Sequence, residues 1–250
     1  MIRILLPLYA LYALGLSAIM AARGHRATTG ARGTPTGRPI RRVLVIGATG
    51  GTGQQLVQQA LELGYEVTAL VRNPAKLQLT HAQLRVVKGD VLDYACVAAA
   101  VQGQDAVLSA LGHRRLFVPS RVQSEGTQNV LRAMQEHGVS RFVCETALGL
   151  GSSAGRMGLF GTLVFLPVFL PIYFWDKSRQ EKAIGQSDVD WVIVRPGILT
   201  NVAKRGTYRH GEDVGSYIIP GRISRADVAD FMLKQLTDDT SVGKAPGLVW

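Results

Sequence analysis

Glycine recurs at every third position in one short stretch of the chain, directly after an apolar run. The stretch GATGGTG places Gly47, Gly50 and Gly53 immediately after the β-branched and leucine residues 43–46. A side chain at these positions would obstruct a tight turn, a ligand, or the contact between a helix and a strand. Because free N–H groups at a helix start attract anions, a strand, this turn and a helix together predict a binding site for nucleotide phosphates. A tight turn without a ligand is the alternative.

Two cations follow the second predicted strand. The segment 42–72 contains a strand, a helix that ends near Gly64 and the second strand YEVTALVR, which is the size of one βαβ unit. A carboxylate after that strand would bind the 2′-hydroxyl of an adenosine ribose, whereas this chain has Arg72 there and Lys76 four residues later. The cations favour the 2′-phosphate of NADP(H) over NAD(H). A solvated basic turn is the alternative.

Tyr173 and Lys177 stand four residues apart, with Glu181 one helical turn further on. Residues at this spacing share a helix face, so the lysine ammonium can lower the pKa of the phenol. The phenol could then give a proton to a carbonyl compound that receives hydride. A helix that begins at Pro171 would place Tyr173 in its first turn, whereas a helix capped by Asp176 would leave Tyr173 outside it. Both starts stay open.

Predicted strands and helices alternate along the rest of the body. The later strands are expected at 84–91, 105–112, 140–147 and 190–197. One helix is expected after a capping box formed by Ser120 and Gln123. A final helix is expected from Ser224, with Asp227 at its third position. Such alternation is typical of an α/β fold with a Rossmann-like, doubly wound parallel sheet in a single domain over 42–250, which binds ligands at the carboxyl ends of its strands.

Several motifs occur in an order that is familiar from one protein family. They are GATGGTG, GYEVTALVRNPAKL, VKGDV, GQDAVLSALG, SEGTQNVLRAMQEHGVSRFV, DWVIVRPG and ISRADVADFMLKQL. Together they resemble the atypical short-chain dehydrogenase/reductase family, in particular the flavin reductase/biliverdin-IXβ reductase type and its bacterial NAD(P)-binding relatives. The resemblance spans about residues 43–238 and implies a Rossmann-like fold that binds NAD(P).

The resemblance also implies roles for individual residues. The residues that would hold the cofactor diphosphate are Gly47, Thr49, Gly50, Gly51, Thr52 and Gly53. Those that would lie at the 2′-phosphate and the adenine are Arg72, Lys76, Asp90 and Val91. Those that would lie along the cofactor and beside the nicotinamide are Leu111, Gly112, Thr146 and Pro196. The flavin reductase type has a serine after the fifth strand, where this chain offers the Thr146 hydroxyl, so Thr146 joins Tyr173 and Lys177 as a catalytic candidate.

The N-terminal region has a composition of its own. Ile4–Ala22 is a stretch of nineteen uncharged residues, close to the ~20 needed to span a bilayer as a helix. Basic residues, beginning with Arg23 and Arg26, follow it, which favours a membrane anchor over a cleaved signal and would keep the body on the cytoplasmic side. A mitochondrial or plastid transit peptide is the alternative. We therefore predict an anchor or targeting segment over 1–23 and a flexible basic linker over 24–41.

A second charge-free segment lies beside the tyrosine motif. It runs over Met157–Trp175 and is interrupted by Pro167 and Pro171, which argues against a straight spanning helix. At the ligand-binding end of this fold it could line an apolar pocket or touch a bilayer surface. We therefore expect a small lipophilic substrate, and a membrane contact through the N-terminal segment. A dimer or core patch is the alternative for the second segment.

Charge and cysteine content argue against other classes of function. The formal net charge is +10, but the first 42 residues hold seven arginines and no acid, which leaves 21 basic against 18 acidic residues in the body. This balance predicts no nucleic-acid partner. Cys96 and Cys144 lack the spacing of a zinc site, and the five histidines show no ligand spacing. We therefore expect no metal and two reduced cysteines.

These observations predict an NADPH-dependent oxidoreductase. It would transfer hydride to an apolar or planar acceptor, such as a quinone, a flavin or a carbonyl compound. The alternative is a non-catalytic NADP(H)-binding redox sensor or assembly factor, because the serine of the resembled type is absent and the helical position of Tyr173 is open. Turnover of NADPH distinguishes the two.

Overall fold

A computed structural model describes most of the chain. It covers residues 39–112, 120–165 and 171–250 together with positions 9, 11–13, 15 and 18, and it leaves out the side chains at 160, 164–165 and 171–174. The predicted leader over 1–23 and linker over 24–41 fall almost wholly outside these residues, so both stay predictions. Within the described part of the chain, no helix is both long enough and apolar enough to cross a bilayer.

Eight strands form one sheet within the described residues, and the sheet is mostly parallel. The spatial order is β3-β2-β1-β4-β5-β6-β10-β8, in which the edge strand β8 is antiparallel to β10. The strands in this order are β3 (Leu84–Lys88), β2 (Glu66–Val71), β1 (Arg42–Ile46), β4 (Ala106–Ser109), β5 (Arg141–Glu145), β6 (Asp190–Pro196), β10 (Gly247–Val249) and β8 (Arg209–Gly211). A separate pair is formed by β7 (Ile198–Thr200) and β9 (Arg222–Ser224). The predicted α/β class is confirmed.

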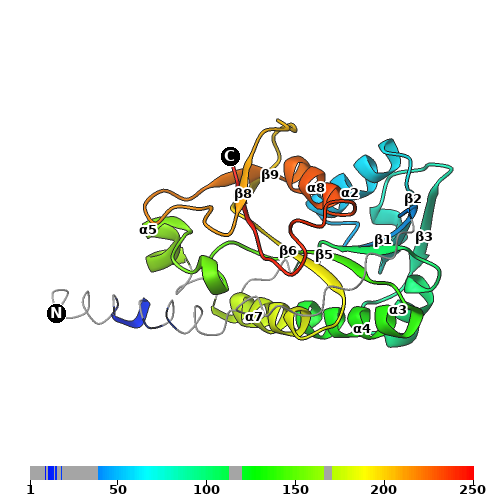
Figure 1. The fold of residues 1–250 in the computed structure, drawn as a ribbon, viewed down its shortest axis with the longest axis horizontal. Coiled ribbons are helices and arrows are strands. Elements are labelled where there is room, and N and C mark those ends of the chain that lie inside the picture. The colour runs from blue at the N-terminus through cyan, green and yellow to red at the C-terminus, as the bar shows by residue number, and fades with distance from the viewer. Residues whose placement is uncertain are drawn as a thin grey trace.

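Helices cover both faces of the large sheet (Figure 1). Those on one side are α3 (Tyr94–Val101), α4 (Val122–His137) and α7 (Pro171–Gly185). Those on the other side are α2 (Gly51–Glu62) and α8 (Arg225–Lys234). Short helical turns lie in the connections: η1 (Pro74–Lys76), η2 (Gly151–Ser153), α5 (Gly158–Phe160) and η3 (Gly161–Phe165). The sheet is therefore doubly wound, as predicted, within a single domain.

Alternating side chains on the central strands divide the core into two apolar clusters. In β5, Val143 belongs to the cluster that includes α2 and α8, whereas Phe142 and Cys144 belong to the cluster that includes α3 and α4. The same alternation continues at the end of the strand, so the side chain of Glu145 bonds to α2 and that of Thr146 bonds to α7. The side chains of these two adjacent residues therefore lie on opposite faces of the sheet.

The strand order reverses between β1 and β4. The chain passes from β1 to β2 and β3 on one side and then returns to β4 on the other side of β1. Open α/β sheets bind their ligands at such a reversal, beyond the carboxyl ends of the strands. The glycine turn that follows β1 and the residues Leu111 and Gly112 that follow β4 both lie at this point.

The start of α4 differs from the prediction. Its N-cap residue is Arg121, whose side chain makes no capping bond, and Ser120 accepts only a 3.3 Å hydrogen bond from the Val122 N–H. The predicted capping box of Ser120 and Gln123 is therefore wrong. The predicted cap of α8 is confirmed, because Ser224 Oγ accepts a 2.9 Å hydrogen bond from the N–H of its third residue.

Asp176 of α7 supplies the missing cap of α4. Its carboxylate accepts hydrogen bonds from the N–H groups of Gln123 and Ser124 at 3.1 and 3.2 Å. A carboxylate at this end of α4 also complements the helix dipole. Because α7 itself begins at Pro171, the alternative in which Asp176 caps its own helix is wrong, and the start at Pro171 is confirmed.

Candidate cofactor site

The glycine turn after β1 leaves no room for a side chain at two of its positions. The Gly50 N–H closes the turn by donating to the Gly47 carbonyl at 2.9 Å. A Cβ at Gly47, where φ is +81°, would lie 2.4 Å from the Ala110 carbonyl oxygen, and a Cβ at Gly53 would lie 2.1 Å from the Gly47 oxygen. Backbone atoms cannot yield at such distances, so glycine is required there. The turn, with Thr49 half-buried in it, brings the first N–H groups of α2 to the carboxyl end of β1.

Thr52, in the first turn of α2, points its hydroxyl inward. Its Oγ1 donates to Glu145 Oε1 at 3.1 Å, and both side chains are buried. The donors that this turn offers to phosphate are therefore backbone N–H groups, which is the usual arrangement for a helix N-terminus that binds an anion. Glu145 therefore connects the glycine turn to the end of β5.

The two predicted cations lie at the carboxyl end of β2. Arg72 directly follows the strand, and Lys76 ends the turn η1, in which Asn73 Oδ1 accepts a hydrogen bond from the Ala75 N–H at 3.1 Å. Both side chains are exposed, and neither forms an ion pair among the described residues. Since β2 is the neighbour of β1, the cations stand beside the glycine turn, where the resemblance expects the 2′-phosphate.

The residues predicted at the adenine follow the next strand, β3. Asp90 accepts a 3.0 Å hydrogen bond from the Leu92 N–H, and Val91 is buried against α4. A Cβ at Gly126 of α4 would lie 2.7 Å from Val91 Cγ1, so the loop and helix approach closely. Asn129 Nδ2 also donates to the Val91 carbonyl at 3.0 Å. These contacts fix the loop at the same edge of the sheet as the glycine turn.

Thr146 follows β5 and belongs to a buried polar cluster. Its Oγ1 donates to Glu181 Oε1 at 2.7 Å. Arg195 of β6 donates to both carboxylate oxygens of Glu181, from Nε at 3.0 Å and from Nη2 at 2.7 Å, and its Nη1 donates to Ser152 Oγ at 2.9 Å. The next residue of β6, Pro196, is buried. The hydroxyl predicted to face the nicotinamide is thus held by an ion pair.

Lys177 is also buried, one turn before Glu181 on α7. Its Nζ donates to the Glu145 carbonyl oxygen at 3.4 Å, so it meets the end of β5 from the α7 side. Gln180 on the same helix donates to Thr127 Oγ1 at 3.0 Å and to Cys144 Sγ at 3.4 Å. The backbone of Tyr173 lies in the first turn of α7, one turn before Lys177, and its side chain is outside the described residues.

Burial shifts the acidity of the groups around β5. Removal from water raises the pKa of Glu145, while the charge of Lys177 and the hydrogen bond from Thr52 oppose that rise. Burial raises the pKa of the Cys144 thiol to about 12, so it is neutral at physiological pH and is no nucleophile. Both cysteines are free thiols in the structure.

Two residues of the site were not assigned by sequence reasoning. Glu145 gives no signal of its own, because the family resemblance points to its neighbour Thr146. Arg195 does carry a signal, because a charged residue inside the apolar strand DWVIVRPG is typical of a buried ion pair. The spacing of its partner Glu181 from Lys177 predicts a shared helix face and gives no sign of this ion pair.

Apolar side chains are exposed on the segments that follow β5 and β8. They are Leu159, Tyr217, Ile218 and Ile219, with exposed fractions of 60, 62, 76 and 72%. The two segments are joined by backbone hydrogen bonds. The Gly158 N–H donates to the Ser216 carbonyl oxygen at 2.7 Å, and the Leu159 N–H donates to the Ile218 carbonyl oxygen at 3.2 Å. We call these four residues the apolar patch. The charge-free segment over 157–175 thus contributes to a surface, and its residues 166–170 lie outside the described part of the chain.

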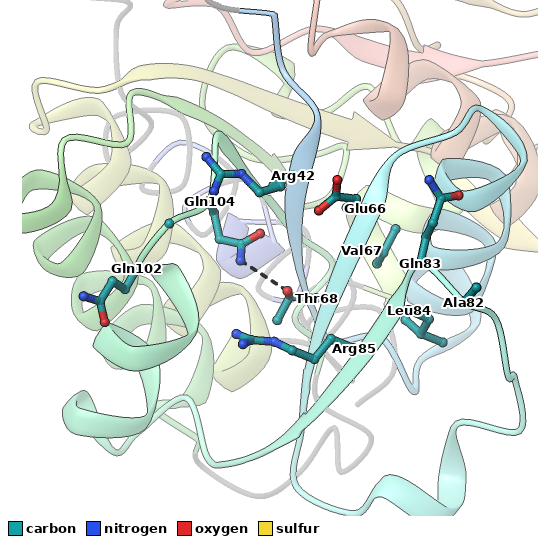
Figure 2. A pocket seen from close by; sticks show the side chains of 11 residues that line it. Arg42, Glu66, Val67, Thr68, Ala82, Gln83, Leu84, Arg85, Gln102 and Gln104 are labelled. Atoms are coloured by element: carbon teal, nitrogen blue, oxygen red, sulfur yellow. Dashed lines mark hydrogen bonds between the residues drawn. The ribbon is translucent and has the colours of Figure 1, made fainter.

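A polar cavity of about 460 Å³ lies at the opposite edge of the sheet, where β1, β2 and β3 begin. Figure 2 shows Gln104 donating to Thr68 Oγ1, at 3.2 Å, with Arg42 and Arg85 in the same cavity. Because ligands of this fold bind at the carboxyl ends of the strands, this cavity is not the cofactor site. Among the described residues, no three His, Cys, Asp or Glu side chains are grouped as a metal site.

Comparison with known proteins assigns the family. A family model described as NAD(P)H-binding matches residues 47–239, which includes the glycine turn, Arg72 and Thr146. The chain belongs to this NAD(P)H-binding family. Its resemblance to atypical short-chain dehydrogenases/reductases is confirmed, and the family supports NADP(H) as the cofactor of the site. The residues of the site fit this cofactor. The N–H groups of the glycine turn could bind its diphosphate, and Arg72 and Lys76 beside the turn could bind its 2′-phosphate.

Individual relatives differ in what they are named for. An uncharacterized chloroplastic protein of Arabidopsis thaliana is 33% identical over 84% of this chain and 76% of its own length. A 3β-hydroxysteroid dehydrogenase/Δ5→4-isomerase of Mycobacterium tuberculosis is 37% identical over 65% of this chain, and the photosystem II assembly factor Ycf39 of Synechocystis is 35% identical over 62%. The chain matches only 48% and 44% of the lengths of these last two relatives.

A solved structure supports the fold. The anaerobillin reductase ChuY of Escherichia coli O157:H7 is 23% identical, with a TM-score of 0.69 over 83% of this chain and 96% of its own. At this identity the likeness concerns the fold alone. The family match makes the chain an NAD(P)H-binding protein, and the structural likeness supports its Rossmann-like fold.

Proposed function

We propose that the protein is an NADPH-dependent reductase of an apolar or planar acceptor, such as a quinone, a flavin or a carbonyl compound. The observation that carries this proposal is the meeting of the glycine turn, the two cations and the Thr146 cluster at one edge of the sheet. When bound, the cofactor supplies the hydride. The protein supplies binding, orientation and a proton.

The proton-handling groups of the proposal lie on α7 and at the end of β5. Tyr173 is proposed as the proton donor, since it precedes Lys177 by one turn of the same helix. Lys177 reaches the end of β5 through the Glu145 carbonyl, and a buried ammonium near a phenol favours the phenolate. The Glu181–Arg195 pair holds the Thr146 hydroxyl beside these groups.

The apolar patch supports a lipophilic acceptor. Exposed apolar side chains on two joined loops at the ligand end of the sheet are what a lipophilic substrate or a bilayer surface would contact. The 3β-hydroxysteroid dehydrogenase relative, whose name states a hydroxysteroid substrate, also supports an acceptor of this class. The chain covers less than half of that relative, so the likeness bears on the substrate class only.

A second function is favoured by a specific observation. The Thr146 hydroxyl already donates its proton to Glu181, so it is not free to donate to a substrate in this structure. A protein that binds NADP(H) without turnover needs no such donor. The Synechocystis relative, a photosystem II assembly factor, supports this alternative of a redox sensor or assembly factor.

One assay separates the two functions. Purified protein would be mixed with NADPH and a panel of quinones, flavins and aldehydes, and oxidation of NADPH would be followed by absorbance. Steady oxidation with at least one acceptor supports the reductase. Tight binding of NADPH with no oxidation by any acceptor would refute it and favour the assembly or sensor function.

The role of the leader belongs to the same proposal. We propose a membrane anchor with a cytoplasmic body or, as the alternative, a segment that targets a mitochondrion or plastid, and the chloroplastic Arabidopsis relative supports the plastid alternative. Expression of the full chain with a C-terminal tag distinguishes these. A shortened chain inside plastids supports targeting, whereas a full-length chain that resists carbonate extraction supports the anchor.

A further inference from the structure

Arg225, the first residue of α8, crosses the backbone of Gly51, the first residue of α2. A Cβ at Gly51 would lie 2.5 Å from Arg225 Cδ and 2.7 Å from its Nε. The φ angle of Gly51 is outside the left-handed region, so its backbone conformation does not demand glycine. The missing side chain at Gly51 therefore leaves room for the arginine side chain, which lies directly against the glycine turn.

No carboxylate of the described residues contacts the guanidinium of Arg225. Its Nη1 donates to the neutral amide oxygen of Asn201 at 2.6 Å, and it forms no ion pair with any described carboxylate. Its charge also acts on the buried carboxyl of Glu145 without contact, where it opposes the rise in pKa that burial causes. The positive ends of α2 and α8 both repel a cation here. A guanidinium held in such a place is suited to a bound anion.

We propose that Arg225 is a further cofactor-binding residue whose guanidinium binds the diphosphate of NADP(H) together with the N–H groups of the glycine turn. The inference rests on the cofactor site and not on the proposed reductase activity. Through Asn201, in the loop that follows β7, the same side chain links that loop to the bound cofactor. Gly51 is then required for the arginine rather than for the turn.

Binding measurements on matched variants test this role. The variant is Arg225→Met, and the control is Arg222→Met, which removes an exposed arginine three residues earlier on β9. The ligands are NADPH, NADH and 2′-AMP, which carries the 2′-phosphate but no diphosphate. Arg225→Met should weaken NADPH and NADH by the same factor, about 10- to 100-fold, as expected for charge-assisted hydrogen bonds. Affinity for 2′-AMP and the melting temperature of the free protein should stay unchanged, and the control should bind all three ligands normally.

Two results would overturn the inference. One is an unchanged affinity of Arg225→Met for NADPH. The other is an equal loss of affinity for 2′-AMP, which would mean that Arg225 stabilises the structure of the whole site and does not bind the diphosphate. Gly51→Ala gives a second test that keeps the arginine: it should weaken NADPH binding in the native background and much less in Arg225→Ala, whose short side chain leaves room for the new Cβ, because that Cβ acts by displacing the arginine side chain. Since the readout is binding, failure of every acceptor to oxidise NADPH would refute the reductase and leave this inference intact.

Discussion

Glu181 and Arg195 form a bidentate ion pair in which each side chain is 1% exposed. The pair joins α7 to β6 and fixes the Thr146 hydroxyl at the end of β5. Desolvation of two charges offsets most of their mutual attraction, so such a pair adds little stability compared with apolar residues of the same volume. Its position at the ligand edge of the sheet indicates that it serves to orient the site.

Removal of one partner from this pair should destabilise the protein strongly. Arg195→Met leaves the Glu181 carboxylate buried and uncompensated, so we expect the free energy of unfolding to fall by about 3–5 kcal/mol. Urea denaturation measures this loss. The matched control is Arg121→Met, which breaks the exposed Arg121–Glu125 pair and should cost at most ~1 kcal/mol. Equal losses in the two variants would contradict the burial argument.

The glycines of the cofactor edge should differ in their tolerance of a methyl group. Gly53→Ala places a Cβ 2.1 Å from the Gly47 carbonyl oxygen, so the turn must open, and both stability and NADPH affinity should be lost. Gly112→Ala meets no atom of the described residues within 4 Å and should fold as the native chain does. Thermal unfolding of the two variants side by side checks this, and a native-like melting temperature for Gly53→Ala would show that the turn is not closed as described.

The parts of the fold that depend on local pattern were predictable from the sequence. Apolar runs of four to seven residues gave β1 to β6, and the spacing of Gly47, Gly50 and Gly53 gave the turn, because both signals are complete within one βαβ unit. The predicted strands after β2 were too long, since the loop residues after each strand, such as Asp90 and Val91, continue the apolar or hydrogen-bonding pattern. The short strands β7 to β10 carry too few residues for any periodicity.

Long-range contacts were not predictable. The cap of α4 comes from Asp176, 52 residues after Ser124, whereas the local motif at Ser120 predicts a capping box that does not form. The crossing of Arg225 over Gly51 joins two segments that meet only when α2 packs on α8. A single sequence records neither of these contacts, because each depends on the assembled sheet.

The 2′-phosphate assignment predicts a selective loss. Arg72→Ala should weaken NADPH at least 10-fold and leave NADH nearly unchanged, because only NADPH carries the phosphate that this guanidinium would bind. Fluorescence titration with the two coenzymes measures both affinities. Arg85→Ala is the control, since it removes an exposed arginine from the cavity at the other edge of the sheet. Equal losses of NADPH and NADH on Arg72→Ala would refute the assignment.

Burial of Glu145 predicts a pH dependence of stability. Its folded-state pKa lies above the unfolded value of 4.5, chiefly because of desolvation, so the folded protein holds this proton more tightly. The contribution is complete below about pH 4.5 and is lost as the pH rises through the folded-state pKa. Glu145→Gln, which cannot ionise, should therefore gain stability relative to the native chain as the pH rises above 4.5. Denaturation curves across this range check the sign, and a difference that is independent of pH would contradict it.

Proton donation by Tyr173 predicts an effect on turnover alone. The start of α7 at Pro171 keeps this residue on the helix that carries Lys177 and Glu181, so the spacing required of a phenol and an ammonium is present in the backbone. Tyr173→Phe should lower kcat by at least 100-fold, within the range of general acid catalysis, and leave the affinity for NADPH unchanged. Thr146→Val, which removes the hydroxyl held by Glu181, serves as the comparison and should also shift the melting temperature. Activity of Tyr173→Phe within a few-fold of the native rate would exclude the tyrosine and leave positioning of the acceptor as the source of catalysis.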